Sequence, residues 1–550
     1  MTPTKQQELI LEHKGNAVII AAPGSGKTFV VSEKIKDILS NLNEFEGVVA
    51  ISYTNKASNE LKGRSLKNGI NPKNSFFGTI DSFFISEIII PFGKQIFGIP
   101  KKQIEVLKIG GLPSEEAELF EWASRELQEE ELSGEYISLL KRYFLNGILL
   151  METLGVLGNY IFSNSKACQN YIKSRYKNIF IDEYQDSGIN QHTLFLRIVE
   201  LGVIGVAVGD LNQSIYKFSG KDSRFLSELS ENKDFKTFPL NKNHRCHDSI
   251  INYSNYLLNP KSELIESSDS RVFFSRIEGN EISIANWING CIPKAKKLFE
   301  VDKNSEIAIL ARTQRTADML NENITIPHRL SITTELDNSL NIWSGIFANL
   351  LHFAFDRNFK FIEVIEFFTS FENLTKQEIK TLIALKNEIK ILFTQSPLDI
   401  KLIVKAFGKV AKIIAPNSPK GDSVNLLTDI LNNELLLNSY HPPSENEVRI
   451  MTLHKSKGLE FDVVFHLDLY EWILPLKSPG KNNDWDNPVY SDWVQDINLH
   501  YVGITRARKA CVLVSSTQRT NSAGATRRGA DSEFLSINGI EGLRYKSNKS

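Results

Sequence analysis

The sequence is poor in the residues that mark several protein classes. Its 550 residues include only four cysteines, Cys168, Cys246, Cys291 and Cys511. They lie too far apart for a zinc ribbon or an iron–sulfur cluster, and they fit a reducing, cytoplasmic environment. Neither sign of charge is in excess, because 64 lysines and arginines accompany 65 aspartates and glutamates. A polyanionic partner would therefore have to bind in a local groove.

The sequence also lacks a long apolar run. The first residues, MTPTKQQELILEHKG, carry charges where a secretion signal has an apolar stretch. The most apolar internal segment, GILLMETLGVLGNYIF over residues 147–162, is interrupted by Glu152, Asn159 and glycines. This segment predicts a buried helix rather than a membrane span, so no membrane partner is expected.

A phosphate-binding loop lies near the start of the chain. The segment NAVIIAAPGSGKTFVV predicts a strand over Ala17–Ala21, a glycine-rich turn and a helix that begins at Lys27. N–H groups of such a turn surround phosphate, the lysine reaches the outer phosphates, and the hydroxyl of Thr28 can hold Mg²⁺. ATP and Mg²⁺ are the expected cofactors, and the expected ATP-binding residues here are Ala22, Pro23, Gly24, Ser25, Gly26, Lys27 and Thr28.

A second strand supplies the acids that such a loop requires. In KNIFIDEYQDS the apolar run 179–181 predicts a buried strand that ends at Asp182 and Glu183. Ligands of open α/β sheets bind at the carboxyl ends of the strands. Asp182 is expected to hold Mg²⁺, and Glu183 to orient or deprotonate the attacking water. The two segments together predict a nucleoside triphosphatase.

Nine short segments follow the motif order of one helicase group. They are KQQELI, AAPGSGKT, AISYTNKASNELKGR, GTIDSFF, FIDEYQDS, VGDLNQSIYKFSG, FPLNKNHRC, MTLHKSKGLEFDVV and LHYVGITRARKACVLV. In this order they resemble the motifs of superfamily 1 helicases of the UvrD/Rep/PcrA type. The resemblance implies an ATP-hydrolysing DNA helicase or translocase with 3′-to-5′ polarity.

The same resemblance implies an α/β fold with two RecA-like P-loop domains, each interrupted by a mostly helical subdomain. The expected first core covers residues 1–84 and 173–239, with an insertion over 85–172. The expected second core covers 240–333 and 441–520, with a reduced insertion over 334–440. Both insertions are shorter than in full-size repair helicases. The resemblance therefore supports ATP hydrolysis more strongly than it supports separation of DNA strands.

The resemblance also assigns residues to the nucleotide. Gln6 matches the glutamine that reads the adenine edge, where an amide can both donate and accept. Arg245 in NHRC and Arg506 in GITRAR match arginines that reach the γ-phosphate from the second core and stabilise charge on the transferred phosphoryl group. The remaining matches are Gly458 beside phosphate, Glu460 at the ribose and Gln213 at the γ-phosphate. The catalytic set is then Lys27, Glu183, Gln213, Arg245 and Arg506.

Other residues match positions that contact single-stranded DNA. Tyr53, Phe218 and His454 correspond to side chains that stack on or touch bases, and such stacking contributes about 1–3 kcal/mol per base without regard to sequence. Polar DNA contacts are expected from Thr54, Asn55, Thr79 and Thr452. The expected nucleic-acid partner is therefore single-stranded DNA or a duplex end.

Four positions depart from the helicase pattern. Ser219 stands where an arginine supports the DNA-contacting aromatic residue, and Asp81 stands where a histidine lies near DNA. His244 replaces the tyrosine, and Phe29 the arginine, that pack against the two faces of the base, so both residues are expected at the ATP base. These changes leave the hydrolytic residues intact but weaken the expected contacts with DNA and with the base.

A narrower resemblance is to the helicase-like subunits of Gabija anti-phage systems. It rests on FIDEYQDS, QSIY, the NHRC motif and GTIDSFFISEIIIPFGKQIFG, a stretch that is not a nucleotide motif. The resemblance implies a GajA-like partner, an OLD-type ATPase fused to a Toprim nuclease. Two other functions stay open. One is a nucleotide- and DNA-sensing regulatory subunit that activates a nuclease without processive unwinding, and the other is a housekeeping DNA repair helicase.

Charge is uneven outside the motifs. Residues 114–135 are rich in acids and predict a helix after Pro113 that faces solvent or a protein partner rather than a duplex. From Thr505 to Ser550 there are nine lysines and arginines but three acids. Residues 521–550 are therefore expected to form a polar, basic tail.

Overall fold

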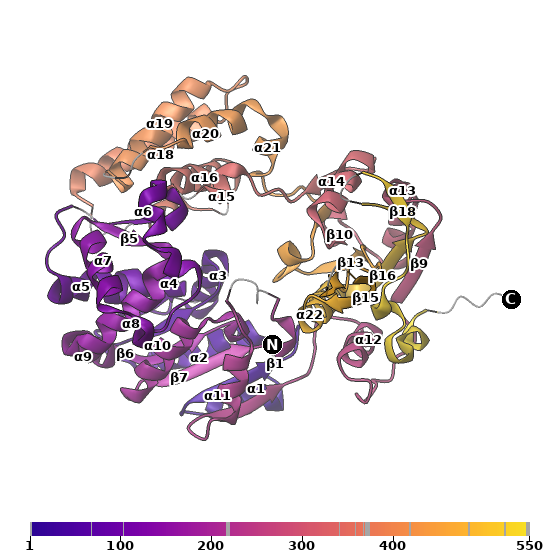
Figure 1. Ribbon diagram of the computed structural model, residues 1–550, viewed down its shortest axis with the longest axis horizontal. Helices are drawn as coiled ribbons and strands as arrows, with labels where there is room; N and C mark the ends of the chain where they lie inside the picture. Colours follow the sequence, from indigo (N-terminus) through magenta and orange to yellow (C-terminus); the bar gives the residue numbers. More distant parts are fainter. Residues whose placement is uncertain are drawn as a thin grey trace.

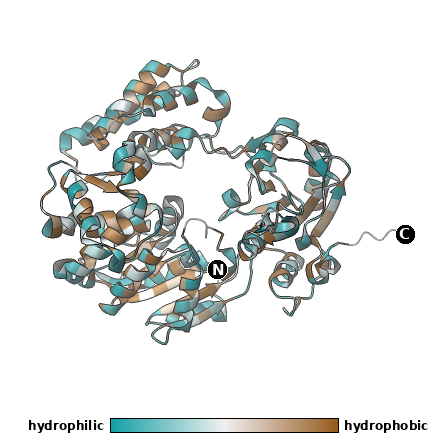
Figure 2. Cartoon of the chain, in the orientation of Figure 1, coloured by the Kyte–Doolittle hydropathy of each residue, from teal (hydrophilic) through white to brown (hydrophobic). Residues whose placement is uncertain are grey.

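The computed structural model describes residues 3–545 apart from 68, 103, 216–219, 340, 358, 367, 369–373, 417, 419, 482–483 and 522–523. Its architecture is α/β, as the sequence predicted, and it contains two sheets of six strands. In Figure 1 the first sheet lies at lower left, the second at right, and the orange helices α18–α20 lie above the first. Figure 2 shows hydrophobic residues concentrated along many of the strands and mixed with hydrophilic ones on most helices. No helix among the described residues is long and apolar enough to cross a membrane.

The first sheet is parallel throughout, in the order β3-β2-β6-β7-β1-β8. Its strands are β1 (Ala17–Ala21), β2 (Gly47–Ile51), β3 (Phe76–Gly78), β6 (Tyr176–Ile181), β7 (Ile204–Gly209) and β8 (Lys236–Leu240). Because a parallel sheet is covered on both faces, its inner strands are largely apolar, as in the AVIIA of β1. The predicted strand at Ala17–Ala21 and the helix that begins at Lys27, α2 (Lys27–Asn41), are confirmed.

Helices cover both faces of this sheet. One face packs against α1 (Lys5–Glu12), α2 and α3 (Asn55–Ser65). The other face shares a single hydrophobic core with α10 (Ile189–Glu200), α11 (Arg224–Glu231) and the first inserted segment. That segment contains α4 (Ile80–Phe83), a π-helix at Phe84–Ile89, α5 (Ile90–Phe97), β4 (Glu105–Leu107), α6 (Ser114–Glu118), α7 (Gly134–Leu145), β5 (Ile148–Leu150), α8 (Leu154–Asn164) and α9 (Lys166–Arg175). The first insertion therefore shares its hydrophobic core with the sheet and does not form a separate unit.

The second sheet repeats the parallel design in the order β11-β12-β10-β13-β16-β9. Its strands are β9 (Val272–Ile277), β10 (Ile307–Ala311), β11 (His328–Leu330), β12 (Val448–Thr452), β13 (Phe461–His466) and β16 (Ala507–Ser516). Its main helices are α12 (Asp248–Leu258), α13 (Glu281–Leu298), α14 (Gln314–Asn323) and α22 (Trp493–Thr505). Two separate two-stranded sheets accompany it, β14 (Lys477–Gly480) with β15 (Asp484–Tyr490) and β17 (Gln518–Thr520) with β18 (Thr526–Arg528). Its two faces carry separate cores.

The second inserted segment is helical and has a core of its own. It contains α15 (Glu335–Asn338), α16 (Ile342–Phe355), α17 (Phe361–Glu366), α18 (Lys376–Leu392), α19 (Ile400–Ile414), α20 (Ser423–Asn432) and α21 (Glu434–Asn438). Phe347, Phe407 and Leu350 lie at its fully buried centre. The exact boundaries of the four units stay predictions.

Three expectations about local structure need correction. The segment 147–162 is not one helix, because its first residues form β5 and only 154–162 belong to α8. The acidic segment does begin with the expected helix after Pro113 and most of its acids are exposed, but this helix, α6, ends at Glu118, short 3-10 turns follow, and Glu129 pairs with Arg197 at 2.6 Å. The expected tail folds back as far as residue 545, because Phe534, Leu535 and Ile540 are buried in the core of the second sheet.

Candidate nucleotide site and DNA groove

The phosphate-binding loop connects β1 to α2. Gly24 and Gly26 have φ angles of 66° and 87°, a left-handed conformation that favours glycine, and Gly26 caps the N-terminus of α2. The loop is closed by Ser25, whose N–H and hydroxyl both donate to the carbonyl of Ala22. Pro23 is buried beneath it. The open N–H groups of this turn and of the first turn of α2 form a cradle suited to phosphate.

The acids at the end of β6 face this loop. The Nζ of Lys27 lies 3.0 Å from a carboxylate oxygen of Glu183. Burial lowers the pKa of Lys27, but Glu183, Asp182 and Asp210 together raise it above its ordinary value. Burial and the adjacent Glu183 raise the pKa of Asp182 to about 6. Lysine and acids therefore form a buried cluster at the carboxyl end of the sheet.

Glu183 occupies an unusual backbone conformation. Its φ is 55°, which is rare for a residue with a side chain and costs about 1–3 kcal/mol. Burial raises the pKa of its carboxyl group, yet the cations of Lys27 and Lys457 hold that pKa low, at about 2. The geometry therefore holds an ionised carboxylate in a strained position, as a water-orienting group requires.

A chain of amide contacts links Glu183 to the turn after β7. Gln185 donates to Glu183 at 2.5 Å, and its carbonyl oxygen accepts the N–H of Asp210 at 3.0 Å. The amide of Gln213 donates to Asp210 at 2.8 Å. All four side chains are at most half exposed, and Gln185 and Gln213 are buried. The opening part of the turn 208–221 is therefore coupled by hydrogen bonds to the acid that faces the phosphate loop.

The second core completes this site with two arginines. Arg506, which is 1% exposed, approaches Gln213 with its Nη2 3.4 Å from the side-chain oxygen. Burial and the neighbouring Arg245 lower the pKa of Arg506 to about 10, so it stays charged at neutral pH. Arg245 pairs with Glu460 at 2.7 Å and lies against the phosphate loop, since a Cβ added to Gly24 would lie 2.5 Å from the Cβ of Arg245. The predicted catalytic residues thus gather around one point from both cores.

A buried ion pair that the sequence did not predict bridges the cores. Lys457 lies 2.6 Å from Asp186 and also 2.6 Å from the backbone carbonyl of Gln213. Burial raises the pKa of Asp186 to about 6, against the opposing effect of Lys457. Both residues stand in predicted motifs, Asp186 in FIDEYQDS and Lys457 in MTLHKSKGLEF. Because the two residues are 271 positions apart, only their places in the motifs could have indicated that they lie near each other.

The residues expected at the base lie on the other side of the loop. The side-chain oxygen of Gln6 accepts the N–H of Asn241 at 3.3 Å. The N–H of His244 donates to the carbonyl of Gly24, and Phe29 packs against the apolar core beneath α2. Gly458 has a φ of 82° and precedes Glu460, the partner of Arg245. The sequence reasoning missed Gln7, whose amide donates to the carbonyl of Ser25 in the loop at 3.2 Å.

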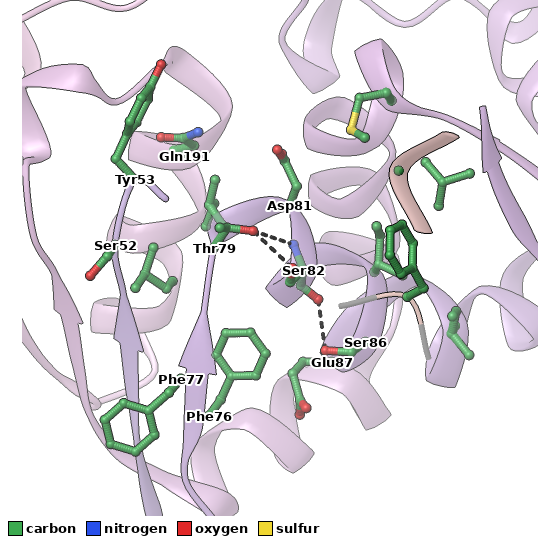
Figure 3. Close-up of a pocket in the computed structure, with 18 of the residues that line it drawn as sticks. Ser52, Tyr53, Phe76, Phe77, Thr79, Asp81, Ser82, Ser86, Glu87 and Gln191 are labelled. Carbon is green, nitrogen blue, oxygen red and sulfur yellow. Dashed lines mark hydrogen bonds between the residues drawn. The ribbon is translucent and has the colours of Figure 1, made fainter. Parts of the chain in front are cut away.

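A groove of about 1460 Å³ runs from Asp182 and Glu183 to both inserted segments. Its lining combines the first core with β4 and with α16 and α19 of the second insertion. Figure 3 shows Tyr53, Thr79 and Asp81 on neighbouring elements at this groove. Thr79 caps α4 by accepting the N–H of Ser82. Two expected DNA-contacting residues, Tyr53 and Thr79, therefore share a groove with Asp182 and Glu183.

The other expected DNA contacts are more dispersed. Thr54 caps α3, Thr452 ends β12, and His454 opens the following 3-10 turn, and none of the three lines this groove among the described residues. Burial, then Arg312 and Lys457, lower the pKa of His454 to about 4, so the ring is neutral. Phe218 and Ser219, and the side chain of Asn55, lie outside the described residues.

The residues present fit ATP and Mg²⁺. The loop offers N–H donors and the amine of Lys27, while Asp182, at the carboxyl end of β6, and the hydroxyl of Thr28 are hard oxygen ligands of the kind that Mg²⁺ prefers. Arg245 and Arg506 add positive charge from the opposite core. The arrangement defines the class: a P-loop nucleoside triphosphatase whose site lies between two parallel-sheet cores.

Comparison with known proteins specifies this class. A family model described as an AAA domain matches residues 6–219, and one described as a UvrD-like helicase C-terminal domain matches residues 367–518. The chain therefore carries an AAA domain followed by a UvrD-like helicase C-terminal domain, and the two together support an ATP-dependent DNA helicase.

Individual relatives cover nearly the whole chain. The Gabija protein GajB of Bacillus cereus (strain VD045) is 26% identical over 540 residues, which cover 93% of this chain and 95% of that protein. A probable DNA helicase II homolog of Mycoplasma genitalium is 25% identical over 615 residues, covering 94% of this chain and 85% of the relative. The ATP-dependent DNA helicase PcrA of Bacillus subtilis is 24% identical over 643 residues, covering 96% and 84%.

Proposed function

We propose that this chain is an ATP-driven motor that moves 3′-to-5′ along single-stranded DNA and serves as the helicase-like subunit of a Gabija-type anti-phage complex. The observation that carries the motor is the contact of Gln213 with Asp210 of the first core and Arg506 of the second. Hydrolysis on this plan requires the two cores to close, and closure supplies the movement. The match with GajB along 95% of its length supports the particular role.

Each side chain has a defined task in this proposal. Bound ATP supplies the phosphoryl group, and Mg²⁺ held by Thr28 and Asp182 supplies positive charge to its oxygens. Lys27 leaves Glu183 for the phosphates, which frees Glu183 to orient water. Arg245 and Arg506 stabilise the charge that spreads over the transferred group. The groove beside Tyr53 and Thr79 holds the DNA strand.

ATP hydrolysis with and without single-stranded DNA tests the motor. We expect strong stimulation by DNA in the wild type and loss of hydrolysis in Lys27→Ala. Displacement of streptavidin from the 3′ or the 5′ end of an oligonucleotide then reports the polarity. A wild type that hydrolyses ATP without any response to DNA would overturn the motor.

The nuclease partnership needs its own experiment. We expect a GajA-like OLD/Toprim nuclease subunit to co-purify with the tagged chain from its native host, as identified by mass spectrometry. Co-purification with no nuclease, together with robust unwinding by the isolated chain, would favour a housekeeping repair helicase.

One observation favours a regulatory alternative. The groove that holds Tyr53 and Thr79 is also lined by the acids Asp81, Glu87 and Glu105. Glu87 is paired with Arg175 at 2.9 Å and four lysines also line the groove, so these carboxylates lower the attraction for a phosphate backbone without abolishing it. A subunit that senses nucleotide and DNA and activates a nuclease needs no firm grip. A strand-displacement assay separates the two functions, because processive unwinding by the isolated chain contradicts the regulatory one.

A further inference from the structure

A lysine outside the recognised motifs joins α1 to the helix of the phosphate loop. Lys34 lies on α2, is 4% exposed, and donates to the carbonyls of Ile10, Leu11 and His13. Burying an ammonium group is costly unless its hydrogen bonds are satisfied. Here three carbonyls at the C-terminal end of α1 satisfy it, where the helix dipole also favours a cation. The last turn of α1 has no basic side chain of its own.

The helix that Lys34 holds carries two glutamines that contact the phosphate loop and the end of β8. Gln7 donates to the carbonyl of Ser25 in the loop, and Gln6 accepts the N–H of Asn241 after β8. At its N-terminus α1 is fixed by a capping box between Thr4 and Gln7. Lys34 therefore fixes the end of α1 that the cap and the glutamines leave free.

We propose that Lys34 is a positioning residue for the nucleotide base: its ammonium group clamps the C-terminal end of α1 to α2 and thereby sets the place of Gln6 at the adenine. The inference rests on the proposed ATP hydrolysis and on the proposed role of Gln6. Lys34 itself does not touch the nucleotide. Its removal lets α1 shift on the loop, so base recognition suffers before the chemistry does.

The charge of this clamp depends on pH. Burial and the nearby Lys14 lower the pKa of Lys34 to about 8, while Asp37 acts in the opposite direction. Lys14 and Asp37 pair with each other at 3.1 Å, and the imidazole of His13 lies beside them in sequence. Above about pH 8 the amine becomes neutral and keeps two N–H groups for three carbonyls. The clamp therefore weakens in alkaline solution.

Steady-state hydrolysis of ATP and GTP by the full-length chain tests the clamp. In Lys34→Met we expect KM for ATP to rise by about tenfold, the scale of losing one charged hydrogen bond. Little change is expected in kcat or in KM for GTP, so the preference for ATP falls. Lys34→Arg, which keeps the charge, should restore it. Lys14→Met, a neighbouring lysine with a 74% exposed side chain, is the matched control at pH 7.5.

The wild type provides a second measurement that needs no variant. Its KM for ATP should rise above about pH 8, whereas that of Lys34→Arg should stay level. An unchanged KM for ATP in Lys34→Met, or an equal loss for ATP and GTP with a fall in kcat, would overturn the proposal. Equilibrium binding of a fluorescent ATP analogue reports the same affinity without turnover. A wild type that binds but never hydrolyses ATP would thus contradict the proposed function, and the binding comparison would still decide on Lys34.

Discussion

At the scale of single residues, the structure pairs the cation of the phosphate loop with the acid that is expected to orient water. Lys27 and Glu183 are 3.0 Å apart and largely buried. A buried charge needs a partner of opposite charge, so Lys27 and Glu183 neutralise each other until Lys27 binds the triphosphate instead. Binding of ATP and activation of Glu183 are therefore one exchange of partners.

Two variants in the turn after β7 should affect different activities, one ATP hydrolysis and the other its stimulation by DNA. Gln213→Ala removes the amide that links Asp210 to Arg506, so we expect hydrolysis to fall by about 10²–10³-fold, the scale of losing one preorganised donor at the reacting group. Phe218→Ala should spare basal hydrolysis and remove only the stimulation by DNA. Asn212→Ala, an exposed neighbour, is the control. Equal loss of basal activity in the Gln213 and Phe218 variants would make the turn merely structural.

The raised pKa of Asp182, about 6, gives a pH dependence. Its proposed role with Mg²⁺ needs the carboxylate, so kcat/KM for ATP should fall as pH drops through about 6, by about tenfold per pH unit below it. Ionisation of Asp182 has the opposite effect on the free energy of unfolding, which it lowers. A raised carboxyl pKa means that the native state binds the proton more tightly, so ionisation of this group disfavours the fold above pH 6.

A profile of kcat/KM for ATP between pH 5 and 8 tests whether activity falls on the acid side of pH 6, the acid limb of the profile. Asp186 also has a pKa of about 6, so Asp186→Asn is the matched variant. The acid limb should persist in Asp186→Asn if Asp182 causes it. A limb that disappears in that variant would assign the titration to Asp186 instead.

At the scale of elements, the C-terminal segment belongs to the second core. Phe534 is fully buried, with its ring 5.0 Å from that of Trp493 and 5.5 Å from that of His500 on α22. Phe534→Ala should destabilise the second core by about 3–5 kcal/mol. Thermal unfolding followed by circular dichroism should show a lower Tm. Ile391→Ala, whose side chain is exposed, should leave the Tm unchanged, and a matching Tm for both variants would contradict the packing.

The same elements show which features of the fold the sequence could predict. β1 and β6 were predictable because an apolar run followed by a glycine-rich turn or by acids is typical of a buried strand that ends at a ligand site. The packing of 533–545 was not predicted, because its apolar residues recur at every third position (534, 537, 540 and 543), the spacing of a short 3-10 helix, within a stretch whose charge predicts a polar tail. Gln7 and Lys34 were missed since their contacts are set by how α1 lies on α2. The pair of Lys457 and Asp186 depends on how two domains meet.

At the scale of the whole molecule, the two cores meet at the proposed nucleotide site. Lys457 of the second core contacts both Asp186 and the backbone of Gln213 in the first. Removing one partner of a buried ion pair leaves the other charge unsatisfied. Lys457→Met should therefore weaken closure of the cores more than it weakens ATP binding to the loop.

Distance measurements between fluorophores can test this. Cysteines placed at the exposed Leu9 and Leu298 label the first and second core, with Cys291 changed to serine. A non-hydrolysable ATP analogue should change the distance in the wild type and change it less in Lys457→Met. Lys14→Met is the control for an altered surface charge. An identical response in Lys457→Met and the wild type would show that the ion pair has no part in closure.

The separate core of the second insertion has an evolutionary consequence. Since α15–α21 enclose their own apolar interior, a change of length there leaves both sheets intact. The first insertion lacks this freedom because it shares a core with the first sheet. Selection can thus trim, extend or replace the second insertion while the ATP-consuming machinery stays the same. New attachments to a shared motor are most easily acquired at that point.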